Sequence, residues 1–331
     1  MIIIQLGGGL GNQMFQYALY LQLKSLGKEV KIDDVTKFTQ NKKRTPMLAP
    51  FGITYERAAK KELEQMLDSS LLPWNRVRRK LFGRKKKAYF EEDKRYHPEI
   101  MAWDDIYLEG YWQTEKYFET AADEVRRAYD TDRLLQHFQD NSIRESTMYS
   151  DIISTGQMSM DDWLSEISSA ESVSVHVRRG DYLLPENLEL FGNICTEVYY
   201  KNAMQQMMME HPDCRFYLFT NDKEWIRERI EEFIGGGAYQ PGTEAADMDL
   251  LGRLEVVDLG NRDGYDYAEF VLMSRCKHNI LANSSFSWWA SYLNPNPDKI
   301  VLVPDVWLNG WDCTDIYRGD MRKVKGITIH E

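Results

Sequence analysis

The sequence lacks the long apolar stretch that a membrane-spanning protein needs. No run in its 331 residues approaches the roughly 20 apolar residues of a membrane helix. The segment 1–7 has no basic region of the kind that opens a signal peptide, and we interpret it as a first strand. The four cysteines lie far apart without a Cys-x-x-Cys pair, so neither a structural zinc site nor a disulfide framework is supported. We therefore expect the chain to work in the cytoplasm.

Positive charge is also scarce, with one exception. The formal net charge is −11, so the molecule is not expected to bind nucleic acid. The segment 76–87 nevertheless carries eight basic residues and no acidic one. A basic run of this kind is usually a solvated face or loop. The alternative hypothesis is a peripheral contact between 76–87 and an anionic membrane surface, which in a bacterium would be the inner membrane.

Strands and helices alternate through the second half of the chain. Val173, Val175 and Val177 alternate with Ser174 and His176, which is typical of a strand. Further strands are expected at 215–219, 255–259, 279–282 and 299–303, and helices at 226–234, 270–277 and 286–293. This alternation predicts a parallel sheet with helices on both faces.

The first third of the chain begins in the same way. We expect a strand over 2–6, a helix over 12–26 that Gly27 ends, and a strand over 29–32. The region 36–110 is less regular, and 115–139 has the pattern of one long helix. The predicted fold class is α/β with two Rossmann-like domains, 1–165 (with the irregular insert 36–110) and 166–331.

Glycines are concentrated between the first strand and the first helix, in Gly7-Gly8-Gly9-Leu10-Gly11-Asn12-Gln13. Glycine lets backbone N–H groups approach an anion at the positive start of a helix. The dinucleotide fingerprint G-x-G-x-x-G is absent, since it would need glycine at Met14 or at Asn12. A tight turn without a ligand is the alternative, but the amides of Asn12 and Gln13 favour contact with a sugar or a phosphate.

A second motif, His176-Val177-Arg178-Arg179-Gly180-Asp181-Tyr182, follows a predicted strand at its carboxyl end, where open α/β sheets bind ligands. Strand alternation puts His176 and Arg178 on one side. Adjacent arginines can hold a diphosphate by bidentate hydrogen bonds and stabilise the charge that develops as it leaves. The alternative is a solvent-exposed loop with an internal pair between arginine and Asp181.

A third motif, Asn283-Ser284-Ser285-Phe286-Ser287-Trp288-Trp289, spans another junction between strand and helix. Serine hydroxyls and the amides of a helix start suit a second phosphate contact. We expect the three aromatic residues to belong to the core, with stacking on a ligand as the alternative. Two Asp-x-Asp pairs, 130–132 and 247–249, resemble a metal-holding motif, but neither follows a strand and a glycine turn, so we expect surface acids and no metal.

These three motifs, in this order, resemble the α-1,2-fucosyltransferases of glycosyltransferase family 11. The resemblance covers nearly the whole chain and includes GGGLGNQMFQYA (7–18), GYWQTEKYF (110–118), HVRRGDY (176–182), YYKNAM (199–204) and LMSRCKHNILANSSFSWWASYL (272–293). The pair HVRRGD and NSSFSWW is very specific. The chain departs from the family pattern at 220–222, at Glu269 and at Trp112.

The resemblance implies a GT-B architecture, in which two Rossmann-like domains face a central cleft. It implies transfer of L-fucose from GDP-fucose to the 2-hydroxyl of a galactose-containing glycan, with inversion and without a metal or cofactor. GDP-fucose would lie on the C-terminal domain and the acceptor on the N-terminal domain, with acceptor contacts in the region 36–120. The absence of the membrane anchor of eukaryotic members fits a bacterial cytoplasmic enzyme. The expected donor-binding residues are Gly9, Gly11, Asn12, Gln13, Arg178, Arg179, Glu269, Ser284, Ser285 and Phe286.

The expected catalytic residues are Arg178, His176 and Asp181. Arg178 would contact the diphosphate, and Glu269 is a candidate for contact with guanine. Asp181 and His176 are the candidates in sequence for the base that accepts the proton of the acceptor hydroxyl, although Asp181 could instead orient an arginine. Two alternatives stay open, namely another fucosyl linkage from a GDP-sugar and a non-catalytic carbohydrate-binding protein. A dehydrogenase is disfavoured by the glycine spacing.

Overall fold

The computed structural model describes residues 1–136, 158–230, 244–259 and 265–326. Contacts divide the chain into two compact units, Met1–Asp130 with Thr314–Ile316, and Thr131–Cys313 with Tyr317–Glu331. Each unit contains one parallel sheet, so the predicted α/β class with a Rossmann-like sheet in each half is confirmed. The predicted domain boundary at residues 165 and 166 stays a prediction, because 137–157 lie outside the described part.

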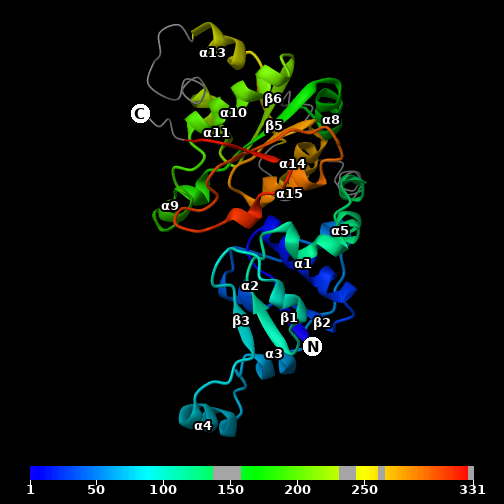
Figure 1. Cartoon of the computed structure of the whole chain (residues 1–331), viewed down its shortest axis with the longest axis vertical. Helices are drawn as coiled ribbons and strands as arrows, with labels where there is room; N and C mark the ends of the chain where they lie inside the picture. The colour runs from blue at the N-terminus through cyan, green and yellow to red at the C-terminus, as the bar shows by residue number, and fades with distance from the viewer. Residues whose placement is uncertain (137–157, 231–243, 260–264, 327–331) are drawn as a thin grey trace, which may run out of the picture. The chain divides into compact units, whose positions relative to one another are not determined.

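The first unit is built on a four-stranded sheet of order β2-β1-β4-β3 (Figure 1). Its strands are β1 (Ile2–Gln5), β2 (Val30–Asp33), β3 (Ala88–Phe90) and β4 (Ile106–Glu109). Every residue of β1 is buried, as expected of the central strand of a parallel sheet. Helix α1 (Leu10–Ser25) follows β1 and packs with η3 (Glu115–Ala121) and α5 (Ala122–Ala128). The expected first strand, first helix and second strand are confirmed to within two residues at each end.

Two parts of this unit differ from the sequence-based expectation. The irregular region contains α2 (Thr36–Gln40), η1 (Ala49–Phe51), α3 (Lys60–Met66), α4 (Pro73–Phe82) and η2 (Pro98–Ala102). The single long helix expected over 115–139 is wrong for the described residues. Phe118 has non-helical dihedral angles (φ −139°, ψ 23°) because its ring is buried against Phe15, and α5 ends at Ala128. Residues 137–139 lie outside the described residues.

The second unit is built on a six-stranded sheet of order β10-β9-β8-β5-β6-β7, in which all paired strands are parallel. Its strands are β5 (Glu171–Val177), β6 (Cys214–Thr220), β7 (Leu254–Val256), β8 (His278–Ile280), β9 (Val301–Pro304) and β10 (Met321–Val324). The chain starts at the centre with β5, builds outward to β7, and then crosses to β8 on the other side. This is the strand order of a doubly wound dinucleotide-type fold.

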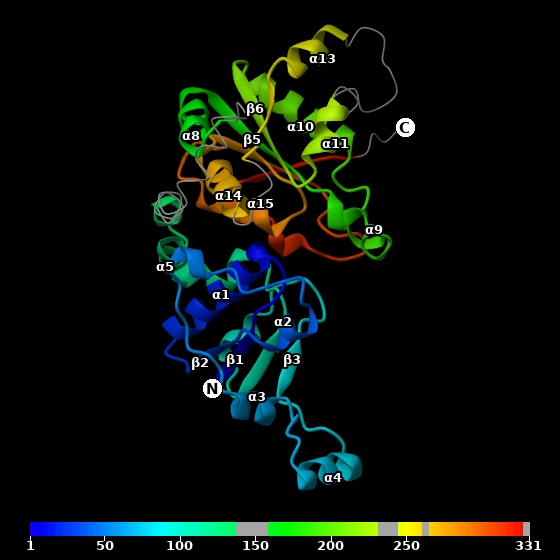
Figure 2. The same cartoon turned by 180° about the vertical axis from the view of Figure 1, so that it is seen from behind.

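Helices cover both faces of this second sheet (Figure 2). One face is covered by α10 (Glu197–Glu210) and α11 (Lys223–Glu228), and the other by α8 (Met160–Ser169), α14 (Tyr265–Arg275) and α15 (Ser285–Leu293). Two shorter elements, η4 (Gly180–Leu183) and α9 (Pro185–Phe191), follow β5, α13 (Glu244–Leu251) precedes β7, and η5 (Thr314–Ile316) belongs to the first unit.

The predicted element types in this unit are confirmed, with shifted ends. The helix expected from residue 270 begins at Tyr265, and the strand expected over 255–259 is β7. The helix expected over 226–234 is α11, which ends at Glu228, and 231–234 lie outside the described residues. Among the described helices, none is both long enough and apolar enough to cross a bilayer.

Candidate active site

The point where the strand order reverses lies between β5 and β8, and ligands of open α/β sheets bind at the carboxyl ends of such strands. Val173, Val175 and Val177 of β5 pack in the core beneath α10. Alternation along the strand therefore directs His176 to the opposite face, where its ring centre lies 5.7 Å from that of Phe286. Arg178 is the first residue beyond β5, and it is partly buried with its guanidinium 5.6 Å from the Tyr182 ring. The predicted strand-end position of both residues is confirmed.

His176 is buried in a way that keeps its ring neutral. Its Nδ1 atom has no hydrogen-bond partner among the described residues. Burial, and secondarily the positive charge of Arg178, lowers the pKa of His176 to about 3. A neutral imidazole can exchange a hydrogen bond with a ligand, but one with so low a pKa is a weak general base near pH 7.

The start of α15 meets the same edge of the sheet from β8. Ser284 is the N-cap of α15, and its hydroxyl accepts a hydrogen bond from the Phe286 backbone N–H at 3.3 Å. The predicted junction between strand and helix is therefore confirmed, and the positive end of α15 lies beside the end of β5. Phe286 is partly exposed between the rings of His176 and Phe270. Trp288 and Trp289 are fully buried, which confirms their core assignment.

Two tyrosines of α10 hold the ends of β5 and β8 in place. The Tyr200 hydroxyl donates to the His176 carbonyl at 2.8 Å, and the Tyr199 hydroxyl donates to the Leu281 carbonyl at 2.5 Å. Tyr182 adds a link between the two motifs, because its hydroxyl donates to the Asn283 carbonyl at 3.0 Å. The sequence interpretation assigned no role to Tyr199 and Tyr200, although they lie in the motif YYKNAM.

Arg179 is engaged differently from Arg178. Its Nε donates to Asp222 Oδ2 at 3.3 Å, and its guanidinium lies 3.4 Å from the centre of the Trp225 ring. Its backbone N–H donates to Asn221 Oδ1 at 2.9 Å, so the turn after β5 is fixed to the turn after β6. Gly180 has φ 62°, and a Cβ there would lie 2.6 Å from Asn221 Nδ2, so this turn requires glycine.

Two acidic candidates have different surroundings. Asp181 belongs to η4, and its side chain lies outside the described part of the chain. Glu269 lies on α14, and its carboxylate forms an ion pair with Lys223 Nζ at 2.9 Å. Burial raises the pKa of Glu269, and Lys223 opposes that change. Lys223 also contacts Asp258 at 3.3 Å, so the candidate for guanine contact is part of a small buried network of charges.

The glycine-rich turn lies in the first unit, at the carboxyl end of β1. Gly8 has φ 76°, and a Cβ there would lie 2.5 Å from Asn12 Nδ2, so glycine is required. Helix α1 begins with Gly9 as N-cap and no side-chain cap hydrogen bond. Asn12 Oδ1 accepts from Gln113 Nε2 at 2.7 Å, which joins this turn to the GYWQTEKYF motif. Gly11 follows in the first turn of α1.

Gln13 is fully buried, and its amide is already used within the first unit. Its Nε2 donates to the carbonyls of Gly8 and Thr45, and its Oε1 accepts from the Met47 N–H at 2.8 Å. These bonds bring the loop 44–47 to the glycine turn. Arg44 is thereby placed so that its Nη1 would lie 3.6 Å from a Cβ at Gly9. No pattern in the irregular region indicated this arginine beforehand.

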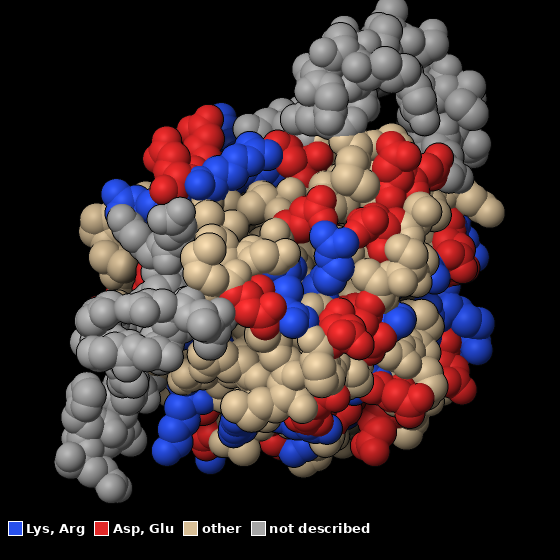
Figure 3. All heavy atoms as spheres, turned by 90° about the horizontal axis from the view of Figure 1, so that it is seen from above, with Lys and Arg blue, Asp and Glu red and all other residues tan. Residues whose placement is uncertain are grey.

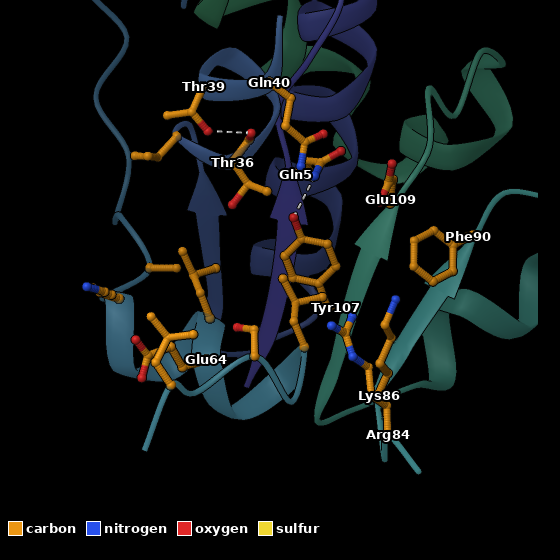
Figure 4. A pocket seen from close by; sticks show the side chains of 17 residues that line it. Gln5, Thr36, Thr39, Gln40, Glu64, Arg84, Lys86, Phe90, Tyr107 and Glu109 are labelled. Carbon is orange, nitrogen blue, oxygen red and sulfur yellow. Dashed lines mark hydrogen bonds between the residues drawn. The ribbon is translucent and has the colours of Figure 1, made fainter. Parts of the chain in front are cut away.

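A pocket of about 660 Å³ lies on the first sheet, within the first unit (Figure 4). Gln5, Tyr107 and Glu109 form its floor, and residues of α2 and α3 form part of its walls. The floor is ordered by a buried chain of hydrogen bonds, since Gln5 Nε2 donates to the Tyr107 hydroxyl at 2.8 Å and that hydroxyl donates to Asp33 at 2.7 Å. The Glu109 carboxylate and the Phe90 ring also line this pocket, so it combines a charged acceptor with apolar surface.

One cluster with metal-binding residue types occurs among the described residues, formed by Glu171, His211 and His278. It lies at the starts of β5 and β8, the edge of the sheet opposite Arg178. His278 Nδ1 accepts the Ile300 N–H at 3.0 Å, which assigns its proton to Nε2, and Nε2 donates to Glu171 at 3.0 Å. Because that nitrogen offers no lone pair, we interpret the cluster as a hydrogen-bond network.

The two Asp-x-Asp pairs are surface acids where the structure describes them. Asp132 pairs with Arg275, and Asp249 pairs with Arg253 four residues along the chain at 3.1 Å. Both carboxylates are more than half exposed.

The fold and the switch-point site are typical of an α/β enzyme whose ligand lies at the carboxyl ends of the strands. Residues 142–319 match the family model described as "Glycosyl transferase family 11", and this match covers more than half of the chain. The chain therefore belongs to glycosyl transferase family 11 and is a glycosyltransferase. The resemblance of its motifs to this family is confirmed.

Curated relatives match along most of the chain. The O-antigen biosynthesis glycosyltransferase WbnK of Escherichia coli is 27% identical, over 92% of this chain and 94% of its own length. An alpha-1,2-colitosyltransferase of Escherichia coli is 26% identical, over 94% and 95%. The mouse galactoside alpha-(1,2)-fucosyltransferase 1 is 25% identical over 87% of this chain, which spans 62% of the mouse protein.

Proposed function

We propose that this glycosyltransferase moves L-fucose from GDP-β-L-fucose to the 2-hydroxyl of a galactose-type acceptor. The observation that carries the proposal is that the family match spans both motifs of the switch-point site, HVRRGDY and NSSFSWW. The names of the relatives support the linkage, since both the mouse enzyme and one bacterial enzyme are named for α-1,2 transfer.

The leaving group is the first chemical problem. Cleavage of the bond between the fucose anomeric carbon and the diphosphate leaves the electron pair, and negative charge, on GDP. Arg178 is the cation nearest the end of β5, and the start of α15 adds partial positive charge beside it. Ser284, Ser285 and Phe286 would contact the phosphates at this helix start. Arg179, held by Asp222 and Trp225, would act mainly by positioning the turn that carries Arg178.

The acceptor hydroxyl attacks the anomeric carbon from the opposite side, which inverts its configuration, and loses its proton as the new bond forms. The low pKa of His176 argues for a neutral hydrogen-bonding role toward the donor. We therefore assign Asp181 as the base to test first. Glu269 would accept hydrogen bonds from guanine. Gly9, Gly11 and Asn12 would be further donor contacts, and Gln13 would order their turn from within.

The pocket on the first sheet is our candidate for the acceptor. Most of its lining residues fall in the region 36–120, where acceptor contacts were expected, and Glu109 places a carboxylate on its floor. Glu109→Gln should raise KM for the acceptor with little change in KM for GDP-fucose. A change confined to the KM for GDP-fucose would contradict this assignment.

A transfer assay tests the function directly. The full chain is incubated with GDP-fucose and a panel of galactosides, and the linkage and anomeric configuration of the product are determined by NMR. We expect an α-1,2-fucoside. Hydrolysis of GDP-fucose without transfer to any galactoside, or a different linkage, would contradict the proposal.

Metal independence is the second arm of the same assay. Arg178 and the helix start can supply the counter-charge that a metal provides in other glycosyltransferases. Turnover should therefore survive EDTA. Loss of turnover in EDTA with recovery on addition of manganese would overturn this part of the proposal.

Colitosyl transfer is a second candidate function. It is favoured by the bacterial relative of that name, which matches 94% of this chain. Supplying the fucose and colitose donors together in the same assay gives the ratio of kcat/KM for the two sugars. We expect the fucose donor to be preferred. A preference for the colitose donor would make colitosyl transfer the better-supported function.

A further inference from the structure

The helix α4 presents an apolar face that nothing in its own unit covers. None of its residues is buried, and the exposed apolar side chains on and beside it are Leu71, Leu72, Trp74, Val77, Leu81 and Phe82. Trp74, Val77 and Leu81 are spaced i, i+3 and i+7, so they lie on one side of the helix, and they are 58–69% exposed. In Figures 1 and 2, α4 projects from the first unit, away from its sheet.

The segment that carries α4 is held in a defined position. Asp68, at φ 48°, pairs with Arg78, lies 3.5 Å from Arg79, and accepts the Lys85 backbone N–H at 2.9 Å. Arg79 also donates to the Ser70 carbonyl at 2.6 Å. One carboxylate thus joins the residues before, within and after α4. These contacts hold α4 in place, so its apolar face is exposed in the folded protein.

This segment is strongly basic, although the chain as a whole is acidic. Eight of the 41 Lys and Arg residues lie in 76–87, which leaves 33 for the rest of the chain against 52 acidic residues. On the face drawn in Figure 3, acidic and basic side chains are interspersed. Among the described residues, no carboxylate pairs with Arg76, Lys80 or Lys85. These three cations are available to an external anion.

We propose that α4 docks the protein on an anionic lipid bilayer. Trp74, Val77 and Leu81 enter the boundary between headgroups and acyl chains, and the cations of 76–87 contact the anionic headgroups. Charge complementarity selects an anionic partner. The exposed aliphatic side chains Val77 and Leu81 favour a bilayer over a nucleic acid, because neither phosphate contacts nor base stacking uses them. A helix lying in the interface is the arrangement that uses both features.

Vesicle binding by the full chain tests the proposal. Vesicles of phosphatidylcholine alone are compared with vesicles that also contain phosphatidylglycerol, and bound protein is measured by flotation. We expect binding only to the anionic vesicles. The triple variant Arg76→Gln, Lys80→Gln, Lys85→Gln should bind about 100-fold more weakly, since each cation contributes roughly a fivefold factor. Trp74→Ser with Leu81→Ser should bind at least roughly tenfold more weakly with the charge intact.

Matched controls distinguish docking through α4 from a general effect of surface charge or exposed apolar side chains. Arg322→Gln, Lys323→Gln and Lys325→Gln remove three exposed cations elsewhere, and Met209→Ser removes an apolar side chain that is 81% exposed. Both control variants should bind like the unmodified chain. Lipids with brominated acyl chains should quench a part of the tryptophan fluorescence that Trp74→Phe removes, which reports insertion of this residue.

Several outcomes would overturn the proposal. These are absence of binding to anionic vesicles, equal binding by the α4 variants and the controls, and quenching that is unchanged in Trp74→Phe. A dimer in solution that Trp74→Ser with Leu81→Ser dissociates would assign the apolar face to a second copy. Binding to nucleic acid that the triple variant abolishes, without vesicle binding, would assign the cations to that partner.

Discussion

At the scale of single residues, the two adjacent arginines after β5 have different surroundings and so different expected roles. Arg179 has a carboxylate partner and an aromatic ring against its guanidinium, whereas Arg178 lies beside the buried His176 and lowers its pKa. The donor diphosphate would meet Arg178 first. The turn that separates the two roles depends on Gly180, whose φ is 62° and where a Cβ would lie 2.6 Å from Asn221 Nδ2.

Arg178→Lys should reduce kcat by about 10²–10³. Lysine keeps the positive charge but loses the planar fork, and loss of one preorganised donor to a developing charge typically has an effect of this size. GDP affinity should fall less, because the charge on the leaving group grows during the reaction. Steady-state kinetics and GDP titration measure the two effects. Arg322→Lys, at an exposed ion pair with Glu210, is the matched control and should be neutral. Near-normal turnover in Arg178→Lys would direct attention to Arg179.

His176 should make the stability of the protein depend on pH. Its pKa is lowered in the folded state, so its contribution to stability is present above about pH 6.5 and is lost as the pH falls toward 3. Unfolding in urea at pH 7 and pH 5 should show a loss of stability that is about 2 kcal/mol smaller in His176→Gln. His97, whose pKa is raised by its hydrogen bond to Asp93, gives the opposite test. His97→Gln should increase the loss, and an unchanged pH dependence in His176→Gln would contradict the assignment.

At the scale of elements, the start of α15 combines a structural and a binding role in one side chain. Ser284→Ala removes the N-cap and should lower the free energy of unfolding by about 1 kcal/mol. It should also weaken GDP binding, because the hydroxyl and the ordered helix start would both contact phosphate. Ser159→Ala removes the N-cap of α8 and is the control, with a similar loss of stability and unchanged GDP affinity. Equal GDP affinity in the two variants would exclude Ser284 from the donor site.

The elements that could be predicted are those whose pattern is set by burial. The alternation of Val173, Val175 and Val177 follows from a strand with one face in the α10 core, and Ser284 lies where a side chain caps the start of α15. The helix α4 was not predicted, since none of its residues is buried and no buried stripe marks it. The break at Phe118 was also missed. Helical spacing alone does not show that the Phe118 ring packs near Phe15 with a non-helical backbone.

For the candidate site, the sequence indicated the motif residues but not the groups that hold them. His176, Arg178 and Ser284 could be placed because strand ends and helix starts are the anion-binding points of an α/β fold. The hydroxyls of Tyr199 and Tyr200 bond to the carbonyls of Leu281 and His176 because α10 packs on the sheet. The local sequence pattern does not show this contact. The same holds for Arg44, which lies near the glycine turn because the hydrogen bonds of Gln13 bring the loop 44–47 there.

At the scale of the whole molecule, the two compact units allow the donor site to be assigned by calorimetry. GDP at about 100 times its Kd should add about 2.7 kcal/mol to the unit that binds it, which for a unit of this size raises Tm by roughly 5–10 °C. Ile3→Ala and Val175→Ala remove fully buried side-chain atoms from the central strand of each sheet, and so identify the transition of each unit. We expect GDP to raise the transition that Val175→Ala lowers, and UDP to raise it much less.

Two results would contradict this expectation. A GDP effect on only the transition that Ile3→Ala lowers would move the main nucleotide contacts to the glycine turn of the first unit. Equal effects of GDP and UDP would remove guanine recognition, and with it the role proposed for Glu269. Arg178→Ala is the internal control. In this variant GDP should raise the Tm of the second unit less, while the Tm without GDP should be unchanged. The nucleotide effect then depends on the residue at the end of β5, as a donor site at the switch point of the second sheet requires.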